Sequence, residues 1–176
     1  MPSPPALSHN LKIAKSCLRG LSEETKEGTA TDDKDNLFQV LALKWGNYPL
    51  NIVDRGAFVT IVFHVEVDKQ VKDKLSLLPD ELREQYRIAF LQELMSNHRT
   101  GTLAKPQNLA DIKQLEGFDI VQNIHLTDGA LSCNRLVDGI QEIVSVAVRA
   151  LNVITLGLGL STTISQPVKP PPDIYI

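Results

Sequence analysis

The fold is decided by residues 58–68, which read FVTIVFHVEVD. Apolar side chains occupy every second position, and Thr60, His64 and Glu66 lie between them, with Val62 as an exception. Successive side chains of a β-strand point to opposite faces of the sheet, so this alternation predicts a strand with one buried and one mainly solvated face. Such a strand is typical of an antiparallel sheet packed against helices.

The segments around this strand predict three more strands. Residues 37–45 and 50–54 are β-type segments, and Gly46-Asn47 and Arg55-Gly56 separate them from each other and from 58–68. Short polar or glycine-containing breaks of this kind predict a three-stranded antiparallel meander. A fourth strand is predicted at 118–126, where apolar residues again alternate with polar ones.

Three amphipathic helices complete the pattern. The first is marked by apolar residues that recur at helical spacing from Leu7 to Leu21, with Ser8 or Asn10 available as its N-cap. The second follows Pro79 and runs to about Asn97. The last has the strongest periodicity, with apolar residues at four- and three-residue steps: Cys133, Val137, Ile140, Val144, Ala147, Leu151 and Ile154. Further apolar residues widen this stripe, which indicates contact on more than one side of the helix.

Residues 7–160 are therefore predicted to form a single α+β domain, an antiparallel sheet packed against helices. Residues 22–36 are almost all polar and rich in carboxylates, so we expect an exposed acidic loop there. Residues 1–6 are predicted to be a flexible start. Residues 161–176 are predicted to be a flexible tail, because its four prolines cannot continue a helix.

Charge and cysteine content restrict the classes of function. The net charge of -3 provides no excess positive field for phosphates, so we expect no nucleic-acid binding. Cys17 and Cys133 are interpreted as small buried hydrophobes, since a disulfide would require two predicted helices to meet there. Unpaired cysteines and a start without the features of a secretory signal predict a cytoplasmic protein.

Membrane association is not expected, although residues 143–167 approach the length of a membrane span. Arg149 lies inside this segment and its second half is polar, and a charge in hydrocarbon is costly. A membrane-associated subunit anchored by residues 150–165 remains an alternative.

The sequence lacks the readable catalytic motifs: it has no GxxxxGK[ST] loop, no GxSxG and no HExxH. We therefore expect no cofactor and favour a protein that is not an enzyme. The alternative is a small metal-dependent or acid–base enzyme that uses His64, Glu66, Asp119 and His125, which all fall on the less apolar face of two predicted strands. Polar residues also occupy any solvated sheet face, and these four have no diagnostic spacing.

Two sets of residues are candidates for binding a protein. Trp45 and Tyr48 flank Gly46-Asn47 and can form an aromatic patch at a hairpin, although such residues more often cover the end of a core. The second set lies on the wide stripe of the last helix and consists of Val144, Val148 and Leu151. This stripe can bury more surface than one sheet contact requires, which favours a homodimer.

Two local patterns add a resemblance to this interpretation. Residues 78–83, LPDELR, lead through a helix to FLQEL at 90–94, and residues 124–131, IHLTDGAL, lead into the last helix. With the preceding strands, the chain from about Leu37 to Ile154 resembles an uncharacterised prokaryotic domain family with the fold of type III secretion chaperones. The acidic loop and the Pro-rich tail lie outside this resemblance.

The resemblance implies a dimer-forming fold without catalysis, in which sheet and helices present grooves to peptide segments. It implies no catalytic residues, because that family has no assigned chemistry. The sequence thus leads to one main hypothesis, a cytoplasmic protein-interaction or chaperone-like module that binds extended or amphipathic protein segments.

Overall fold

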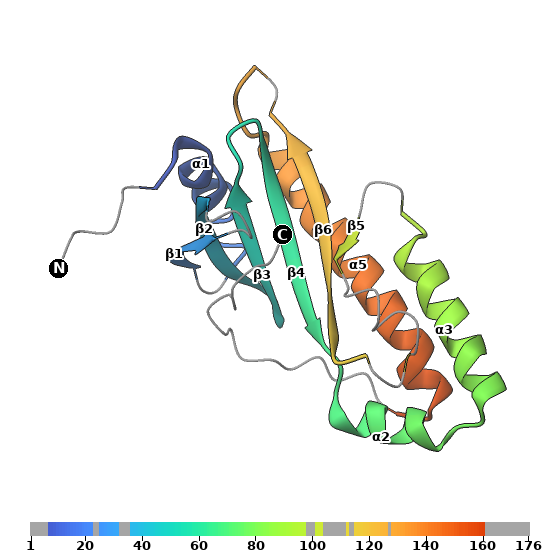
Figure 1. Cartoon of the computed structure of the whole chain (residues 1–176). Helices are drawn as coiled ribbons and strands as arrows, with labels where there is room; N and C mark the ends of the chain where they lie inside the picture. Colours follow the sequence, from blue (N-terminus) through green and yellow to red (C-terminus); the bar gives the residue numbers. More distant parts are fainter. Residues whose placement is uncertain are drawn as a thin grey trace. The chain divides into compact units, whose positions relative to one another are not determined.

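The computed structural model describes residues 7–22, 25–31, 36–97, 101–103, 112, 115–126 and 128–160. It contains helices and strands in mixed order, which confirms the α+β class (Figure 1). The elements are α1 (His9–Cys17), β1 (Thr25–Thr31), β2 (Leu37–Trp45), β3 (Tyr48–Asp54), β4 (Phe58–Glu66), α2 (Lys69–Leu77), α3 (Asp80–Leu94), β5 (Gly101–Leu103), β6 (Gly117–His125) and α5 (Cys133–Gly157). The predicted flexible ends, 1–6 and 161–176, lie outside the described residues.

The strands form a six-stranded sheet in the order β1-β2-β3-β4-β6-β5. β1 to β4 pair antiparallel in sequence order, which confirms the predicted meander from β2 to β4. Trp45 and Tyr48 are opposite each other where β2 turns into β3. Gly46 has a φ of 57°, and a glycine with positive φ at the first turn position is what a tight type II′ hairpin requires.

The register explains which face of the meander is buried. Leu41 lies opposite Ile52, which lies opposite Ile61, and all three are fully buried. The other face is buried too at the sheet centre, where Thr60 and Val62 are inaccessible. The prediction of a mainly solvated second face was therefore wrong for the first half of β4, where the chain covers the strand on both sides.

The chain divides into two compact units. Of the described residues, the first unit contains those up to Val62 and Asn123–Ile140, and the second contains those from Phe63 to Gln122 and from Gln141 to Leu160. β4, β6 and α5 each pass from one unit into the other. The sequence had predicted a single domain.

In the first unit, α1 lies beside β2 and β3 (Figure 1). Of the two predicted candidates, Ser8 is its N-cap and accepts a hydrogen bond from the backbone N–H of Leu11 at 3.2 Å. The Oγ of Ser8 donates to Asp54 at 2.6 Å, and Nδ2 of Asn10 donates to the same carboxylate at 3.3 Å. These bonds attach the start of α1 to the end of β3, while Leu11 and Ala14 bury its inner face.

In the second unit, α3 runs alongside α5 (Figure 1). The hydroxyl of Tyr86 donates to the carbonyl of Gly157 at 2.8 Å, and Nε of Arg149 donates to Glu93 at 3.0 Å. Phe90 meets Phe118 of β6 edge to face, with 5.1 Å between ring centroids. These contacts fix one side of α3, and its other side faces solvent.

Three elements were missed in the sequence. β1 lies inside the predicted acidic loop, and its side chains are mostly exposed, so no hydrophobic alternation marks it. It forms because all seven of its residues pair with β2. α2 buries only Val71 and Leu75, and the short β5 pairs with only three residues of β6.

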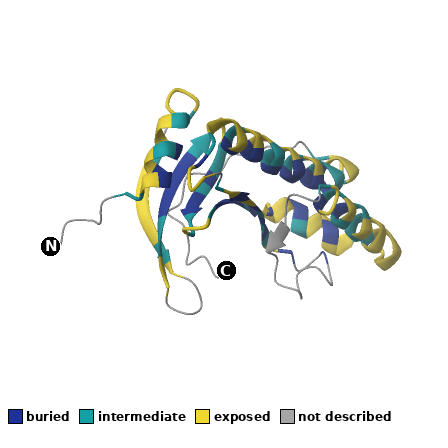
Figure 2. Cartoon of the chain, turned by 90° about the horizontal axis from the view of Figure 1, so that it is seen from above, coloured by how far each residue is buried: buried dark blue, intermediate teal, exposed yellow. Residues whose placement is uncertain are grey.

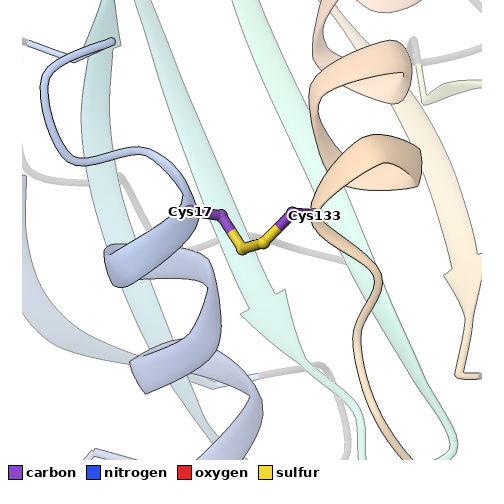
Figure 3. The surroundings of a disulfide bond; sticks show 2 residues. All are labelled: Cys17 and Cys133. Atoms are coloured by element: carbon purple, nitrogen blue, oxygen red, sulfur yellow. A yellow bond between two sulfur atoms is a disulfide. The ribbon is translucent and has the colours of Figure 1, made fainter.

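The cysteine prediction was also wrong. Cys17 and Cys133 form a disulfide that joins the end of α1 to the start of α5, with 5.4 Å between the Cα atoms (Figure 3). The two helices do meet at this point, and Cys133 is exposed while Cys17 is half-buried. Because disulfides persist mainly in oxidising compartments, the pair removes the argument from cysteines for a cytoplasmic location.

α5 is long and apolar enough to cross a membrane by length and composition alone, but half of its apolar window is buried inside the protein. A buried core helix passes the same test. Most of its exposed positions carry polar side chains: Asn134, Arg135, Asp138, Gln141, Ser145 and Arg149. Leu156, near the end of the helix, is an exposed apolar residue. α5 thus has the burial of a core helix with one solvated side.

Candidate functional site

Polar side-chain contacts join β4 to β6. The hydroxyl of Thr60 donates to Oδ1 of Asn123 at 2.8 Å, and Nδ1 of His64 lies 2.7 Å from Oδ1 of Asp119. From the first pair to the second, the residue number rises by four on β4 and falls by four on β6. This is the pattern of antiparallel strands in which the two members of each pair lie directly opposite each other. The sequence-predicted residues His64 and Asp119 are therefore brought together by the register of the sheet.

The His64–Asp119 pair is partly accessible. The side chains are 38% and 29% exposed, so solvent reaches the pair. A carboxylate on one ring nitrogen of histidine fixes the orientation of the ring and favours the tautomer with the proton on that nitrogen. The pair therefore has the geometry of an acid–base dyad.

Gly117 makes room for this pair, and it was not among the site residues predicted from the sequence. A Cβ at this position would lie 2.7 Å from the carbonyl oxygen of Val65 and 3.5 Å from Cε1 of His64. β6 can approach β4 at this rung only because residue 117 has no side chain. A glycine inside a strand often marks such a close approach, which is the one signal the sequence offers.

The other two predicted ligands do not join the pair in a metal centre. His125 packs against Phe58, with 6.0 Å between ring centroids, and Glu66 lies exposed at the end of β4. Among the residues that the structure describes, no group of three potential ligands gathers around a point. The described residues therefore give no support to the alternative that His64, Glu66, Asp119 and His125 bind a metal ion.

The predicted protein-binding residues fall into two groups. Trp45 and Tyr48 are neighbours across the hairpin and each is half-buried. Val144 and Val148 are half-buried, and Leu151 is only 7% exposed. The width of the α5 stripe therefore reflects contacts within the chain, which leaves Leu151 inaccessible to a partner.

The exposed apolar residues lie mainly elsewhere, on the helices of the second unit. Each helix has an exposed side, whereas the strands at the centre of the sheet are mostly buried (Figure 2). On α3, Met95 is 76% exposed and Ile88 is 45% exposed, and the half-buried Leu91 lies between them on the same helical face. We call Ile88, Leu91 and Met95 the α3 stripe.

Charges adjoin one end of the α3 stripe. Glu84 lies one turn before Ile88 on the same face and accepts hydrogen bonds from Arg87. This bond lowers the pKa of Glu84 below its ordinary value and raises the pKa of Arg87. Glu81, one turn earlier, is exposed, so the end of the stripe carries carboxylates.

Comparison with known proteins supports the fold and nothing finer. No protein-family model and no curated protein sequence matches this chain. A crystal structure of an uncharacterized protein from Methanothermobacter thermautotrophicus is similar, with a TM-score of 0.66 and 15% sequence identity. The match covers 85% of this chain and 99% of that one. At this identity the likeness shows a shared fold only.

Proposed function

We propose that the protein is a non-enzymatic interaction module that binds an amphipathic protein segment on the α3 stripe. The observation that carries the proposal is the exposure of Ile88 and Met95, because contiguous exposed apolar side chains on a soluble protein mark interaction surfaces. The residues lie one to two turns apart, which matches the spacing of anchors in helix-in-groove recognition. The exposed Glu81 near this stripe favours a segment with a basic residue beside its apolar anchors.

A chaperone-like role and self-association belong to this proposal. The resemblance to the type III secretion chaperone fold implies dimers and peptide grooves. An amphipathic helix of a second copy of the chain could also be the segment that binds the α3 stripe. The proposed location is the cytoplasm. This part of the proposal is separately testable, because the thiols of Cys17 and Cys133 would stay unbonded in a reducing compartment, and a Cys17–Cys133 disulfide in protein isolated from cells would oppose it.

The test compares binding of designed peptides to the wild type and to two double variants. The peptide carries leucines at helical spacing with flanking lysines, and a control peptide has the lysines replaced by glutamates. Ile88→Gln with Met95→Gln removes the exposed apolar side chains of the α3 stripe. Leu21→Gln with Leu37→Gln removes equally exposed leucines of the first unit and serves as the matched control.

We expect fluorescence anisotropy to show saturable binding of the lysine peptide, loss of this binding in the stripe variant, and retention in the control variant. Sedimentation of the wild type over a concentration series shows at the same time whether the stripe joins two copies. A wild type that stays monomeric and binds neither peptide would remove the proposal. Equal weakening in both double variants would show that the stripe is not the site.

The second candidate is acid–base chemistry at the His64–Asp119 pair, which the 2.7 Å contact favours. A histidine held by a carboxylate is the usual general base of hydrolytic enzymes. Its test is hydrolysis of a panel of activated esters by the wild type and by His64→Gln and Asp119→Asn variants. Activity that both substitutions abolish would favour this function, and equal activity in all three proteins would exclude the pair as a catalytic site.

A further inference from the structure

The disulfide joins two helix ends within the first unit (Figure 3). Cys17 is the last residue of α1, and Cys133 is the first residue of α5. Cys133 is exposed and Cys17 is half-buried. The bond therefore lies at the boundary between this unit and solvent, with Cys133 on the solvent side.

The register of the sheet shows which surface α1 covers. α1 contacts β2 and β3, and Nζ of Lys15 pairs with Glu27 of β1 at 2.8 Å. Glu27 lies opposite Leu41, and residues that are opposite each other in an antiparallel ladder share one face of the sheet. α1 therefore lies on the face that carries buried apolar residues of β2 and β3: Leu41, Leu43, Leu50 and Ile52.

α1 is attached at both of its ends, by different means. At its start, Oγ of Ser8 and Nδ2 of Asn10 donate to the carboxylate of Asp54 at 2.6 and 3.3 Å. At its end, the disulfide joins Cys17 to α5. Its inner face carries three fully buried residues: Leu11, Ala14 and Leu18. A helix of nine residues is not stable alone in water, so α1 depends on these attachments.

The two cysteines differ in reactivity because they lie at opposite kinds of helix end. The positive end of the α5 dipole lies at Cys133 and stabilises a thiolate there, whereas the negative end of the α1 dipole lies at Cys17. Within two positions along the chain, Cys133 has one arginine, and Cys17 has one arginine and one lysine. That lysine, Lys15, is already paired with Glu27. Exposure and helix position therefore both favour Cys133 as the sulfur that reacts first.

We propose that the Cys17–Cys133 pair is a site of thiol–disulfide exchange with a dithiol, and that its reduction releases the end of α1 from the sheet. A thiolate of the dithiol attacks Sγ of Cys133 and forms a mixed disulfide, and Cys17 leaves as a thiolate. The second thiolate of the dithiol attacks the reagent's sulfur in the mixed disulfide, which closes the reagent's own disulfide and releases Cys133. Two electrons thus pass from the dithiol to the protein, and the protons of the dithiol pass to the two cysteines or to solvent.

Reduction leaves α1 attached at one end. The bonds to Asp54 still hold its start, while Cys17 loses the covalent link to α5. The end of the helix then opens locally, and each opening uncovers apolar residues of β2 and β3. Oxidation closes the bond and stops this opening. The redox state of the pair therefore controls whether this apolar face of the sheet is covered.

The first test measures release of α1 with a lysine-specific protease and with dithiothreitol as the dithiol. Millimolar dithiothreitol should reduce the bond in the folded wild type. Cleavage after Lys15 of α1 should then become about tenfold faster or more, because a protease cuts a helix only where it opens. Cleavage after Lys72 should change by less than about twofold, since α2 is a helix of the same length without a disulfide. The Cys17→Ser, Cys133→Ser double variant should be cleaved like the reduced wild type, with or without dithiothreitol.

The second test measures which cysteine exchanges first, with glutathione disulfide as the probe. Cys17→Ser keeps Cys133, and Cys133→Ser keeps Cys17. Mass spectrometry should show that the variant with Cys133 forms the mixed disulfide with glutathione about tenfold faster or more.

Four results would overturn the proposal. A bond that dithiothreitol reduces only after the protein unfolds would show a purely structural disulfide. Equal acceleration of cleavage after Lys15 and Lys72 would show general destabilisation, and no acceleration would show that α1 stays docked without the bond. A Cys17 thiol that reacts with glutathione disulfide as fast as that of Cys133 would remove the assigned order of the exchange.

Discussion

The disulfide between Cys17 and Cys133 was not predicted from the sequence. We expect its removal to lower the thermal stability of the protein by a large and measurable amount. Cys17 and Cys133 are separated by 116 residues, so the bond closes a loop that contains most of the chain. In the chain-entropy description, a crosslink of this length lowers the entropy of the unfolded chain enough to stabilise the fold by about 5 kcal/mol. For a protein of this size, that corresponds to a fall of roughly 10–20 °C in Tm when the bond is absent.

Thermal and urea unfolding can both be followed through the fluorescence of Trp45, the one tryptophan of the chain. The oxidised wild type should unfold at a higher Tm than the Cys17→Ser, Cys133→Ser double variant. Because Cys133 is exposed, a reductant should lower the Tm of the wild type to that of the double variant, and it should leave the double variant unchanged. Equal Tm values for oxidised wild type and double variant would refute this reasoning.

Three further predictions concern single contacts. Asp54→Ala removes the carboxylate that accepts hydrogen bonds from Ser8 and Asn10. We expect the free energy of unfolding in urea to fall by about 2–3 kcal/mol and amide exchange in α1 to become faster. Unchanged amide exchange would contradict this role of Asp54. Gly117→Ala introduces a Cβ at 2.7 Å from a backbone oxygen of β4 and should cost about 1–3 kcal/mol, whereas an unfolding free energy equal to that of the wild type would show that the strands have room to separate. Because the folded state lowers the pKa of Glu84 below 4.5, its pairing with Arg87 stabilises the fold fully above that pH and progressively less as the pH falls through the lowered value. The difference in unfolding free energy between wild type and Glu84→Gln should therefore shrink on acidification, and a difference independent of pH would contradict the pairing.

The elements that sequence periodicity predicted are those that bury a regular apolar face. β4 and α5 are the clearest, because their apolar residues recur at the period of the element over its whole length. β1 was missed because an edge strand with exposed polar side chains is stabilised by backbone pairing, which leaves no pattern in the side chains. α2 was missed because two buried residues are too few to show a helical period.

Sites were less predictable than elements, because they depend on contacts between distant segments. His64 and Asp119 pair because of the register between their strands. Nothing in the sequence indicated that these two of the four candidate residues would meet and that Glu66 and His125 would not. Whether a residue on a wide apolar stripe faces the core or solvent also depends on tertiary packing. Leu151 was assigned to the partner-binding stripe of the last helix, and packing within the chain leaves it only 7% exposed.

The central claim is that the chain meets its partner through the exposed stripe of α3. The sequence contains two methionines, Met1 and Met95, so selective methyl labelling gives one NMR signal on the stripe and one at the start of the chain. Titration with the lysine-bearing amphipathic peptide should shift the Met95 signal in a saturable way and leave the Met1 signal unchanged. A Met95 signal that stays in place while the peptide binds elsewhere, or while the peptide does not bind at all, would contradict the claim.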